Sequence, residues 1–288
     1  MRIAIIDLGS NSARMSVWDV KGEKAELLLN KREYVRLSEG LSEDNRLKEE
    51  PMRRALLALS DFKELSKGLK VTALRAVATE AVRRAANGKE FVARVKKECG
   101  IDLEILSGES ESKYDFYASL PLIGEKSAVI MDVGGGSIEL VRCEKGSYIS
   151  HACLPYGAVV TTDRMGSELS RLNEFFLEEF SHLPMLSGIV KADIVALGGS
   201  ARAFFSLYSA NKEGAWVTAK DFRTKTEGLL ALPPSELEKL SPLNERADII
   251  AAGLSPFYAL SVILKSEKII LNNRGVREVI ILECIKTK

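Results

Sequence analysis

Histidine is nearly absent from this 288-residue chain, in which His151 and His182 are the only two. A metal centre built on clustered histidines is therefore excluded, and any metal binding or acid–base chemistry has to use carboxylates. The four cysteines form no C-x-x-C pair, so we expect reduced thiols rather than disulfides. Reduced thiols are typical of the cytoplasm, where we expect the protein to reside.

An excess of one charge and long apolar runs are also missing. The formal charge is +1, so no overall field attracts nucleic acid or an acidic membrane surface. No apolar run approaches the roughly 20 residues that a membrane-spanning helix requires. The opening "MRIAIIDLGSNS" lacks the apolar region of a signal peptide and is typical of a strand. We therefore expect neither nucleic acid nor a membrane as a partner.

Two short apolar runs end in the same pattern, "AIIDLGSNSARMSV" and "VIMDVGGGSIELV". Each continues with aspartate, glycine and serine at identical offsets, which are Asp7, Gly9 and Ser12 in the first and Asp132, Gly134 and Ser137 in the second. The copies lie nearly half the chain apart, which predicts two related halves. A joint at 121–126 divides them into predicted domains 1–124 and 125–288.

Strand-like segments follow both turns, since "ARMSVWDV" and "IELVRCEKG" roughly alternate in polarity. Each unit is therefore predicted to be a hairpin, whereas a P-loop or a dinucleotide fingerprint requires a helix after the turn. A third glycine turn, 198–200, precedes a helix-like segment, and such a helix start can bind an anion. Strands that alternate with helices along the chain predict the α/β class.

Backbone amides in glycine turns can cradle phosphate oxygens, but carboxylates beside them would repel phosphate. A hard cation resolves this conflict, because Mg²⁺ takes oxygen ligands from one or two carboxylates and from phosphate. The candidate metal ligands are Asp7, Asp132 and Glu139. For the two aspartates, an Asx turn at a strand end is the structural alternative.

Glu109 and Glu111 begin a predicted helix in "SGESESKYDFY". They are either acids that favour a helix start or include a general base that activates water. Basic residues are concentrated in 70–97. This run is interpreted either as a solvated helix face or as the wall of a phosphate-binding cleft. Two arginines are candidates for bidentate phosphate contacts, namely Arg14 after the first turn and Arg83 near a predicted helix start.

Taken together, these motifs resemble the exopolyphosphatase / guanosine pentaphosphate phosphohydrolase family of the actin-like ATPase superfamily. The resemblance rests on "DLGSNSAR", "VATEAVRRAAN", "LSGESES", "DVGGGSIEL", "LPYGAV", "ALGGSARAF", "NERADIIAAG" and "GVREVI", in the family's order. It implies two ribonuclease-H-like (actin-like ATPase) domains that flank a central cleft. The implied activity is release of terminal phosphate from inorganic polyphosphate, or of the 5′ γ-phosphate from guanosine pentaphosphate, with Mg²⁺ or Mn²⁺ and water.

The resemblance also assigns residues to roles. It implies that the catalytic residues are Glu111, Asp132, Glu139 and Arg83. The phosphate-binding residues that we expect are Gly9, Ser10, Asn11, Ser12, Arg14, Gly134, Gly135, Gly136, Ser137, Gly198, Gly199 and Ser200. The chain departs from the family pattern at Ser110, Ser112, Ile138 and Ser200. It also lacks the C-terminal helical region of longer relatives, so we expect a short form.

Two other functions compete with hydrolysis. An ATP-dependent kinase of the same superfamily would need an adenine pocket, often with a late glycine-rich segment, for which Gly253 and Gly275 are weak candidates. A non-catalytic sensor of guanosine pentaphosphate would bind without turnover, although Glu111 argues against it. The expected partner is a polyphosphate or a phosphorylated guanine nucleotide. The sequence does not fix the oligomeric state, and a homodimer is among the expectations.

Overall fold

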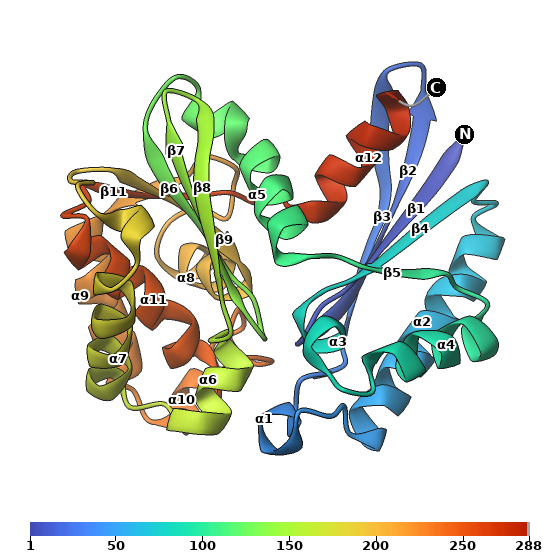
Figure 1. Ribbon diagram of the computed structural model, residues 1–288, viewed down its shortest axis with the longest axis horizontal. Helices are drawn as coiled ribbons and strands as arrows, with labels where there is room; N and C mark the ends of the chain where they lie inside the picture. Colours follow the sequence, from blue (N-terminus) through green and yellow to red (C-terminus); the bar gives the residue numbers. More distant parts are fainter. Residues whose placement is uncertain (287–288) are drawn as a thin grey trace. The chain divides into compact units, whose positions relative to one another are not determined.

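The computed structural model describes residues 1–286, apart from the side chains of residues 42 and 43. Contacts divide the chain into two compact units. Unit 1 comprises Met1–Glu111 and Val276–Lys288, and unit 2 comprises Ser112–Gly275. Figure 1 gives the order of the elements along the chain.

This division differs from the predicted boundary between residues 124 and 125. Pro121, at the start of the predicted joint, lies within the last turn of helix α5 (Gly108–Ile123). The first turn of α5 belongs to unit 1 and the rest to unit 2. The final helix α12 (Val276–Lys286) returns to unit 1, where it packs on strand β1 (Arg2–Leu8). Such a return cannot be found from a boundary search along the sequence.

Unit 1 is a five-stranded sheet in the order β3-β2-β1-β4-β5. Its other strands are β2 (Ser12–Lys21), β3 (Lys24–Tyr34), β4 (Ala73–Ala78) and β5 (Leu103–Ile105), and its other helices are α1 (Leu41–Asp44), α2 (Glu49–Gly68), α3 (Glu80–Arg84) and α4 (Gly88–Cys99). β1 pairs antiparallel with β2 and parallel with β4. Alternation along β1 and β2 directs Leu8 and Met15 into a core with Phe62 and Phe91 of α2 and α4. The opposite face of β1 meets α12 (Figure 1).

Unit 2 is a six-stranded sheet in the order β10-β11-β9-β6-β7-β8. Its strands are β6 (Ala128–Val133), β7 (Ile138–Glu144), β8 (Ser147–Leu154), β9 (Asp193–Gly198), β10 (Trp216–Thr218) and β11 (Lys268–Leu271). Its helices are α6 (Ala158–Met165), α7 (Leu169–Ser181), α8 (Gly199–Tyr208), α9 (Ala219–Leu230), α10 (Pro234–Leu237) and α11 (Ile250–Ile263), with a 3₁₀ turn η1 (Pro184–Leu186).

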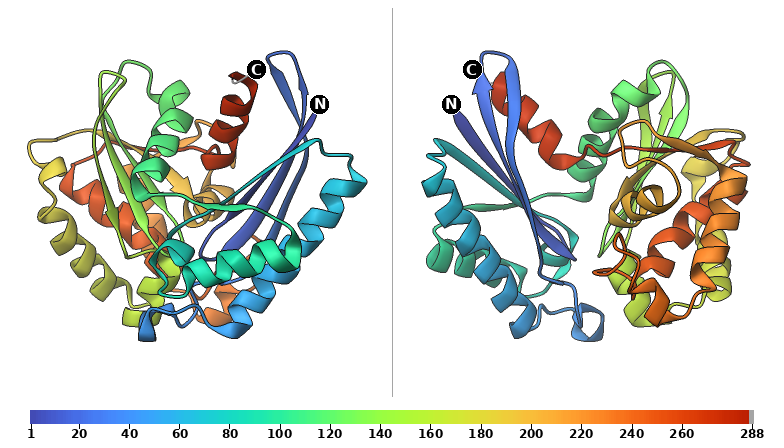
Figure 2. Two further views of the ribbon diagram at one scale, coloured as in Figure 1. Left: turned by 45° about the vertical axis from the view of Figure 1, so that its right-hand side comes forward. Right: turned by 180° about the vertical axis from the view of Figure 1, so that it is seen from behind.

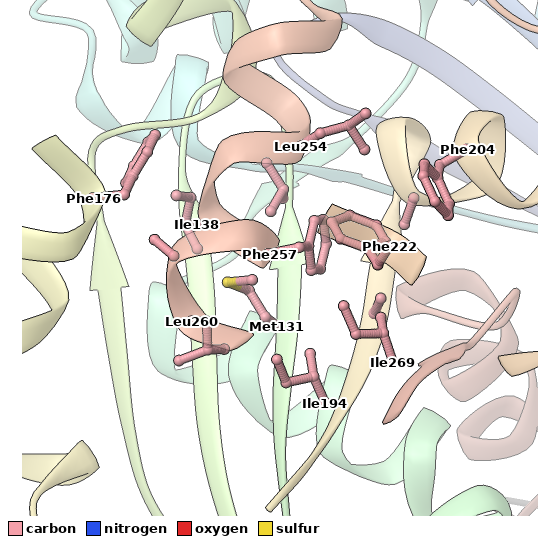
Figure 3. Packing of buried hydrophobic residues seen from close by; sticks show 14 of the residues in the cluster. Met131, Ile138, Phe176, Ile194, Phe204, Phe222, Leu254, Phe257, Leu260 and Ile269 are labelled. Carbon is pink, nitrogen blue, oxygen red and sulfur yellow. The ribbon is translucent and has the colours of Figure 1, made fainter. Parts of the chain in front are cut away.

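The core of unit 2 forms around α11, which is apolar on nearly all sides and is accordingly buried. Leu254, Phe257 and Leu260 of α11 lie over Met131 and Ile138 of the sheet (Figure 3). α5 covers the other face of this sheet, where Phe116 packs with Ile130 and Val195 (Figure 2).

The two sheets share one plan, as the repeated motif predicts. In each, an antiparallel meander (β1-β2-β3 or β6-β7-β8) is followed by a parallel strand beside its first member (β4 or β9). This is the ribonuclease-H-like arrangement, so the predicted α/β class and paired related units are confirmed. None of the helices among residues 1–286 has the length and apolar character needed to cross a membrane.

Candidate active site

The two predicted hairpin turns have the same backbone geometry. Gly9 N donates to Ser12 O at 3.1 Å, and Gly134 N donates to Ser137 O at 3.0 Å. A Cβ added to Gly9 would lie 3.3 Å from Ser12 O, and a Cβ added to Gly134 would lie 3.3 Å from Ser137 O. We name these segments turn 1 (residues 9–12) and turn 2 (residues 134–137).

Turn carbonyls are bound by neighbouring amides in both units. In turn 1, Asn11 O accepts from Val35 N at 3.1 Å and from Arg36 N at 2.9 Å. In turn 2, Gly135 O accepts from Val159 N at 2.9 Å and from Val160 N at 3.2 Å, at the start of α6. The carbonyls are thereby held against protein donors instead of facing a bound anion.

The backbone N–H groups at the centre of each turn differ from the carbonyls in this respect. Within the part of the chain that the structure describes, the N–H groups of Ser10, Asn11, Gly135 and Gly136 donate no hydrogen bond. Successive N–H groups of this kind form an anion-binding nest. Each unit therefore contains a nest of the kind that can hold an anion, and phosphate binding at both turns stays a prediction.

Turn 2 depends on a glycine that we did not single out, Gly157 in "LPYGAV". A Cβ at Gly157 would lie 2.4 Å from Gly135 C, Gly136 N and Ser137 N, so only glycine allows α6 to approach the turn. The motif that contains Gly157 is visible in the sequence, but its contact with turn 2, about 20 residues earlier, is not.

The third glycine turn lies at the end of β9 beside Asp132. Gly198 has a φ of 99°, and an added Cβ would approach Val133 O to 2.4 Å and Asp132 Oδ1 to 2.9 Å. Gly199 follows at the start of α8, as predicted. Ser200 is 1 % exposed, and its hydroxyl packs against Gly253, so a phosphate contact from this residue would have to use its backbone amide.

Arg246 of "NERADIIAAG" is a second residue that sequence reasoning missed. It is buried, and its guanidinium lies 2.4–2.7 Å from the position that a Cβ on Gly199 would occupy. A buried cation beside a glycine turn adds positive charge there. In the sequence, Arg246 is a single arginine more than 40 residues after Gly199, and nothing local indicates that the two are in contact.

Carboxylates face each other across the hairpin of unit 2. Asp132 and Glu139 are directly opposite in the β6–β7 register, and Cys153 is opposite Glu139 in the β7–β8 register. Glu139 is 5 % exposed, and its Oε1 accepts from Ser137 Oγ at 2.6 Å and from Cys153 Sγ at 3.3 Å. We call Asp132, Glu139 and Cys153 the unit 2 row.

The unit 2 row fits a hard cation better than it fits phosphate alone. Like charges that face each other directly across two strands destabilise a sheet. A cation shared by Asp132 and Glu139 relieves that repulsion, and two carboxylates plus phosphate oxygens suit Mg²⁺. Among residues 1–286, no group of three or more His, Cys, Asp or Glu side chains is arranged to hold a metal by itself. A two-carboxylate site completed by substrate is consistent with that finding.

The equivalent position in unit 1 carries the opposite charge. Asp7 is opposite Arg14 in the β1–β2 register, where unit 2 has Asp132 opposite Glu139. Asp7 therefore has a cationic neighbour of its own. Its predicted role as a metal ligand remains a prediction.

Glu111 and Arg83, predicted from different motifs, are in direct contact. Arg83 Nη1 donates to Glu111 Oε2 and, at 2.7 Å, to Leu106 O. Arg83 Nη2 donates to Glu80 Oε2 at 2.5 Å. Burial alone would lower the pKa of Arg83, but the charges of Glu111 and Glu80 raise it above its usual value. The guanidinium is thus a permanent cation that fixes the Glu111 carboxylate.

The start of α5 explains why Glu111, and not Glu109, is the candidate base. Ser107 Oγ accepts from Ser110 N at 3.1 Å and caps the helix, so Ser110 contributes to the cap. Glu109 is exposed, whereas the Glu111 side chain is 9 % exposed. Ser112 is fully buried. The departures from the family pattern at Ser110 and Ser112 therefore leave the Glu111 carboxylate in place.

Besides Arg83, three cations of the basic run 70–97 are paired with acids from outside the run. Arg75 contacts Glu104 and Glu283, Arg94 contacts Glu49 and Glu98, and Lys96 contacts Asp102. These pairs were invisible in the local sequence, since most of the acids lie outside the run. They favour an ordinary ion-paired surface for these three residues.

Two related α/β units, each opening with the same hairpin turn, define a protein of the actin-like ATPase fold class. Within that class, the chain belongs to the Ppx/GppA phosphatase family, whose model matches residues 16–288. The match begins after turn 1, which comprises residues 9–12.

Solved structures give the same assignment. A family member from Aquifex aeolicus is 28% identical with a TM-score of 0.79, over 100% of this chain and 98% of that one. Another structure, of the Aquifex aeolicus PPX-GPPA enzyme, is 30% identical with a TM-score of 0.79, over 98% and 99% of the two chains. An exopolyphosphatase from Cytophaga hutchinsonii is 20% identical with a TM-score of 0.90, over 100% and 98%, and shows the shared fold.

Proposed function

We propose that this chain is a phosphoanhydride hydrolase that releases the terminal phosphate of inorganic polyphosphate, the 5′ γ-phosphate of guanosine pentaphosphate, or both. Membership of the Ppx/GppA family supports phosphatase activity. The amide nest of each unit supports a substrate that contains phosphate, because such a nest can hold the oxygens of one phosphoryl group.

Glu111 carries this proposal. Nests alone would suit a sensor as well, but Glu111 is a buried carboxylate that Arg83 holds in one orientation, as a base that activates water should be. In the proposed reaction, Glu111 accepts a proton from the attacking water as the water oxygen bonds to the terminal phosphorus. The bond from phosphorus to the bridging oxygen breaks, and that oxygen leaves with the shortened substrate.

Arg83 acts through Glu111 in this scheme. Its guanidinium is already bonded to two carboxylates and a carbonyl, so its main role is to orient Glu111. We therefore treat Arg83 as a positioning residue. This revises the expectation that it binds substrate phosphate.

Mg²⁺, or Mn²⁺, would be held by Asp132 and Glu139. When bound, the cation supplies charge neutralisation for the phosphate oxygens. Ser137 and Cys153 both bind Glu139 Oε1, which fixes the carboxylate and directs its other oxygen away from them. Gly198 keeps the space beside Asp132 Oδ1 clear.

The kinase alternative loses its sequence support. Gly253 lies inside α11, where an added Cβ would approach Ser200 Oγ to 2.0 Å, so this glycine serves helix packing. Gly275 lies just before α12 and has open space around its Cα. Neither is part of a glycine-rich loop.

The test is phosphate release from polyphosphate, ATP and guanosine pentaphosphate, measured side by side with Mg²⁺. We expect release from polyphosphate or guanosine pentaphosphate, and a loss of about 10²–10⁴ in kcat for Glu111→Gln with unchanged thermal stability. Binding of guanosine pentaphosphate without turnover would replace the proposal with a sensor. Transfer from ATP to an added acceptor would replace it with a kinase.

A further inference from the structure

Arg32 lies in line with the proposed site of unit 1, although no motif includes it. In the register of the sheet, Asp7 is opposite Arg14, and Arg14 is opposite Arg32 on β3. Residues directly opposite each other point to the same face of a sheet. Asp7, Arg14 and Arg32 are therefore a row across three strands, which we call the unit 1 row.

The guanidinium of Arg32 is stacked on an aromatic ring of the same strand. Arg32 Cζ lies 4.9 Å from the centroid of the Tyr34 ring. Tyr34 is opposite Ser12, the last residue of turn 1. The stacking thus holds the Arg32 guanidinium on the side of the strand nearer to turn 1. It also reduces the conformational freedom that the Arg32 side chain loses when an anion binds.

Arg32 is exposed and has no carboxylate partner among the residues that the structure describes. Its sequence neighbours on the strand, Lys31 and Glu33, pair with each other at 3.1 Å. The two other exposed arginines of unit 1 are both paired with acids, Arg46 with Glu90 and Arg53 with Glu50. Among these three exposed arginines, Arg32 therefore differs in being oriented by an aromatic ring and not by an acid.

The far end of the same sheet face is already covered. Arg277 of α12 donates to Asn30 Oδ1 at 2.8 Å, two residues before Arg32 on β3. The polar face of unit 1 thus extends from turn 1 to Arg32 and ends where α12 begins. Across this interval, two guanidinium groups accompany a single carboxylate.

We propose that Arg32, stacked on Tyr34, binds phosphate groups of the substrate beyond those held by turn 1. The inference rests on the proposed hydrolase function and deepens it. Adjacent strands are about 4.8 Å apart, so Arg32 lies about 10 Å from Asp7 across the sheet. A substrate that reaches both must be a chain of several phosphates rather than a single phosphoryl group.

The experiment compares Arg32→Gln with Lys24→Gln, which removes the same charge from the opposite end of β3. Substrates are long-chain polyphosphate, inorganic triphosphate and guanosine pentaphosphate. For Arg32→Gln we expect KM for long-chain polyphosphate to rise roughly 3- to 10-fold while kcat stays within about twofold, since a charged hydrogen bond is lost from binding only. Arg32→Lys should restore part of the loss, and Tyr34→Leu should raise KM less than Arg32→Gln does.

Comparison of the substrates shows which phosphate groups Arg32 contacts. A rise common to polyphosphate and guanosine pentaphosphate supports a contact with the phosphates that both contain. A rise confined to long-chain polyphosphate supports a contact with distal phosphates. Equal KM values for Arg32→Gln and Lys24→Gln, on any substrate that the wild-type protein hydrolyses, overturn the inference and leave the hydrolase proposal intact. No hydrolysis by the wild-type protein defeats the hydrolase proposal itself.

Direct binding of inorganic triphosphate, measured by calorimetry, then tests Arg32 separately. Equal dissociation constants for Arg32→Gln and Lys24→Gln overturn the inference.

Discussion

Turn 1 and turn 2 close with the same glycine-to-serine bond, at 3.1 Å and 3.0 Å, yet the strands beside them carry different charges. In the unit 1 row, Asp7 is followed by Arg14 and Arg32. In the unit 2 row, Asp132 is followed by Glu139 and Cys153. The shared backbone explains why both units can hold phosphate. The different rows suit different ions, an anion in unit 1 and a cation in unit 2.

The contrast shows how a duplicated unit can acquire two tasks. The backbone nest depends on glycine and on carbonyls held elsewhere, and these features are present in both copies. The residue opposite the aspartate is not part of the turn, so it can change without altering the nest. Exchange of arginine for glutamate at that position is enough to reverse the local charge.

Removal of Arg83 should have the largest effect among the variants that follow from this comparison. Arg14 and Arg83 are both predicted site residues of unit 1, and the comparison assigns anion binding to Arg14 and positioning of Glu111 to Arg83. Arg83→Ala should lower kcat about 10- to 100-fold with little change in KM, because the carboxylate loses its fixed orientation. Arg83→Lys should rescue only partly, since a lysine cannot reproduce the bidentate fork.

Arg84→Ala is the matched control, because the Arg84 side chain binds Asn45 and not Glu111. Steady-state kinetics on polyphosphate gives kcat and KM for each variant. A rise in KM without loss of kcat for Arg83→Ala would return Arg83 to the substrate-binding residues.

Gly198 provides the next test, because unit 1 has an alanine at the equivalent position. Gly198 pairs with Val133 across β6 and β9, and Ala78 pairs with Leu8 across β1 and β4. Gly198→Ala should destabilise the protein by about 1–3 kcal/mol and raise the Mg²⁺ requirement, because φ is positive and the Cβ meets Asp132 Oδ1.

Thermal denaturation and the Mg²⁺ titration of activity measure the two effects. Gly228→Ala is a control, since an added Cβ there meets nothing within 4 Å. Wild-type stability of Gly198→Ala would show that unit 2 tolerates the conformation of unit 1 at this position.

The smallest effects are expected from the basic run. Arg94→Gln and Lys96→Gln should change KM for polyphosphate less than about twofold, because both cations are already paired with acids at the surface. A KM increase as large as that for Arg32→Gln would restore the basic run as a phosphate-binding wall.

The sequence predicted the features that are local or repeated. Equal offsets of Asp7 and Asp132 predicted the paired hairpins, and the residues after each turn distinguished a hairpin from a P-loop. Glu111 and Arg83 were both named, but their contact was not, because the two residues lie 28 positions apart on different helices.

The features that were missed depend on long-range packing. Gly157 and Arg246 contact turns that are distant in sequence, and α12 returns to unit 1 after all of unit 2. The row of Arg32 required the register of three strands, which a sequence pattern does not give. The basic run looked uncompensated for the same reason, since Glu49, Asp102 and Glu283 lie outside it.

The most direct test of the central claim compares Arg14→Gln with Glu139→Gln, which change equivalent positions of the two units. Substrate KM is measured at saturating Mg²⁺, and half-saturating Mg²⁺ is measured at saturating substrate. We predict that Arg14→Gln raises KM by about tenfold or more and leaves the Mg²⁺ curve in place, whereas Glu139→Gln moves the Mg²⁺ curve by about tenfold or more and changes KM less. If both variants shift the same curve, or if the two shifts are exchanged, the assignment of anion to unit 1 and cation to unit 2 is wrong.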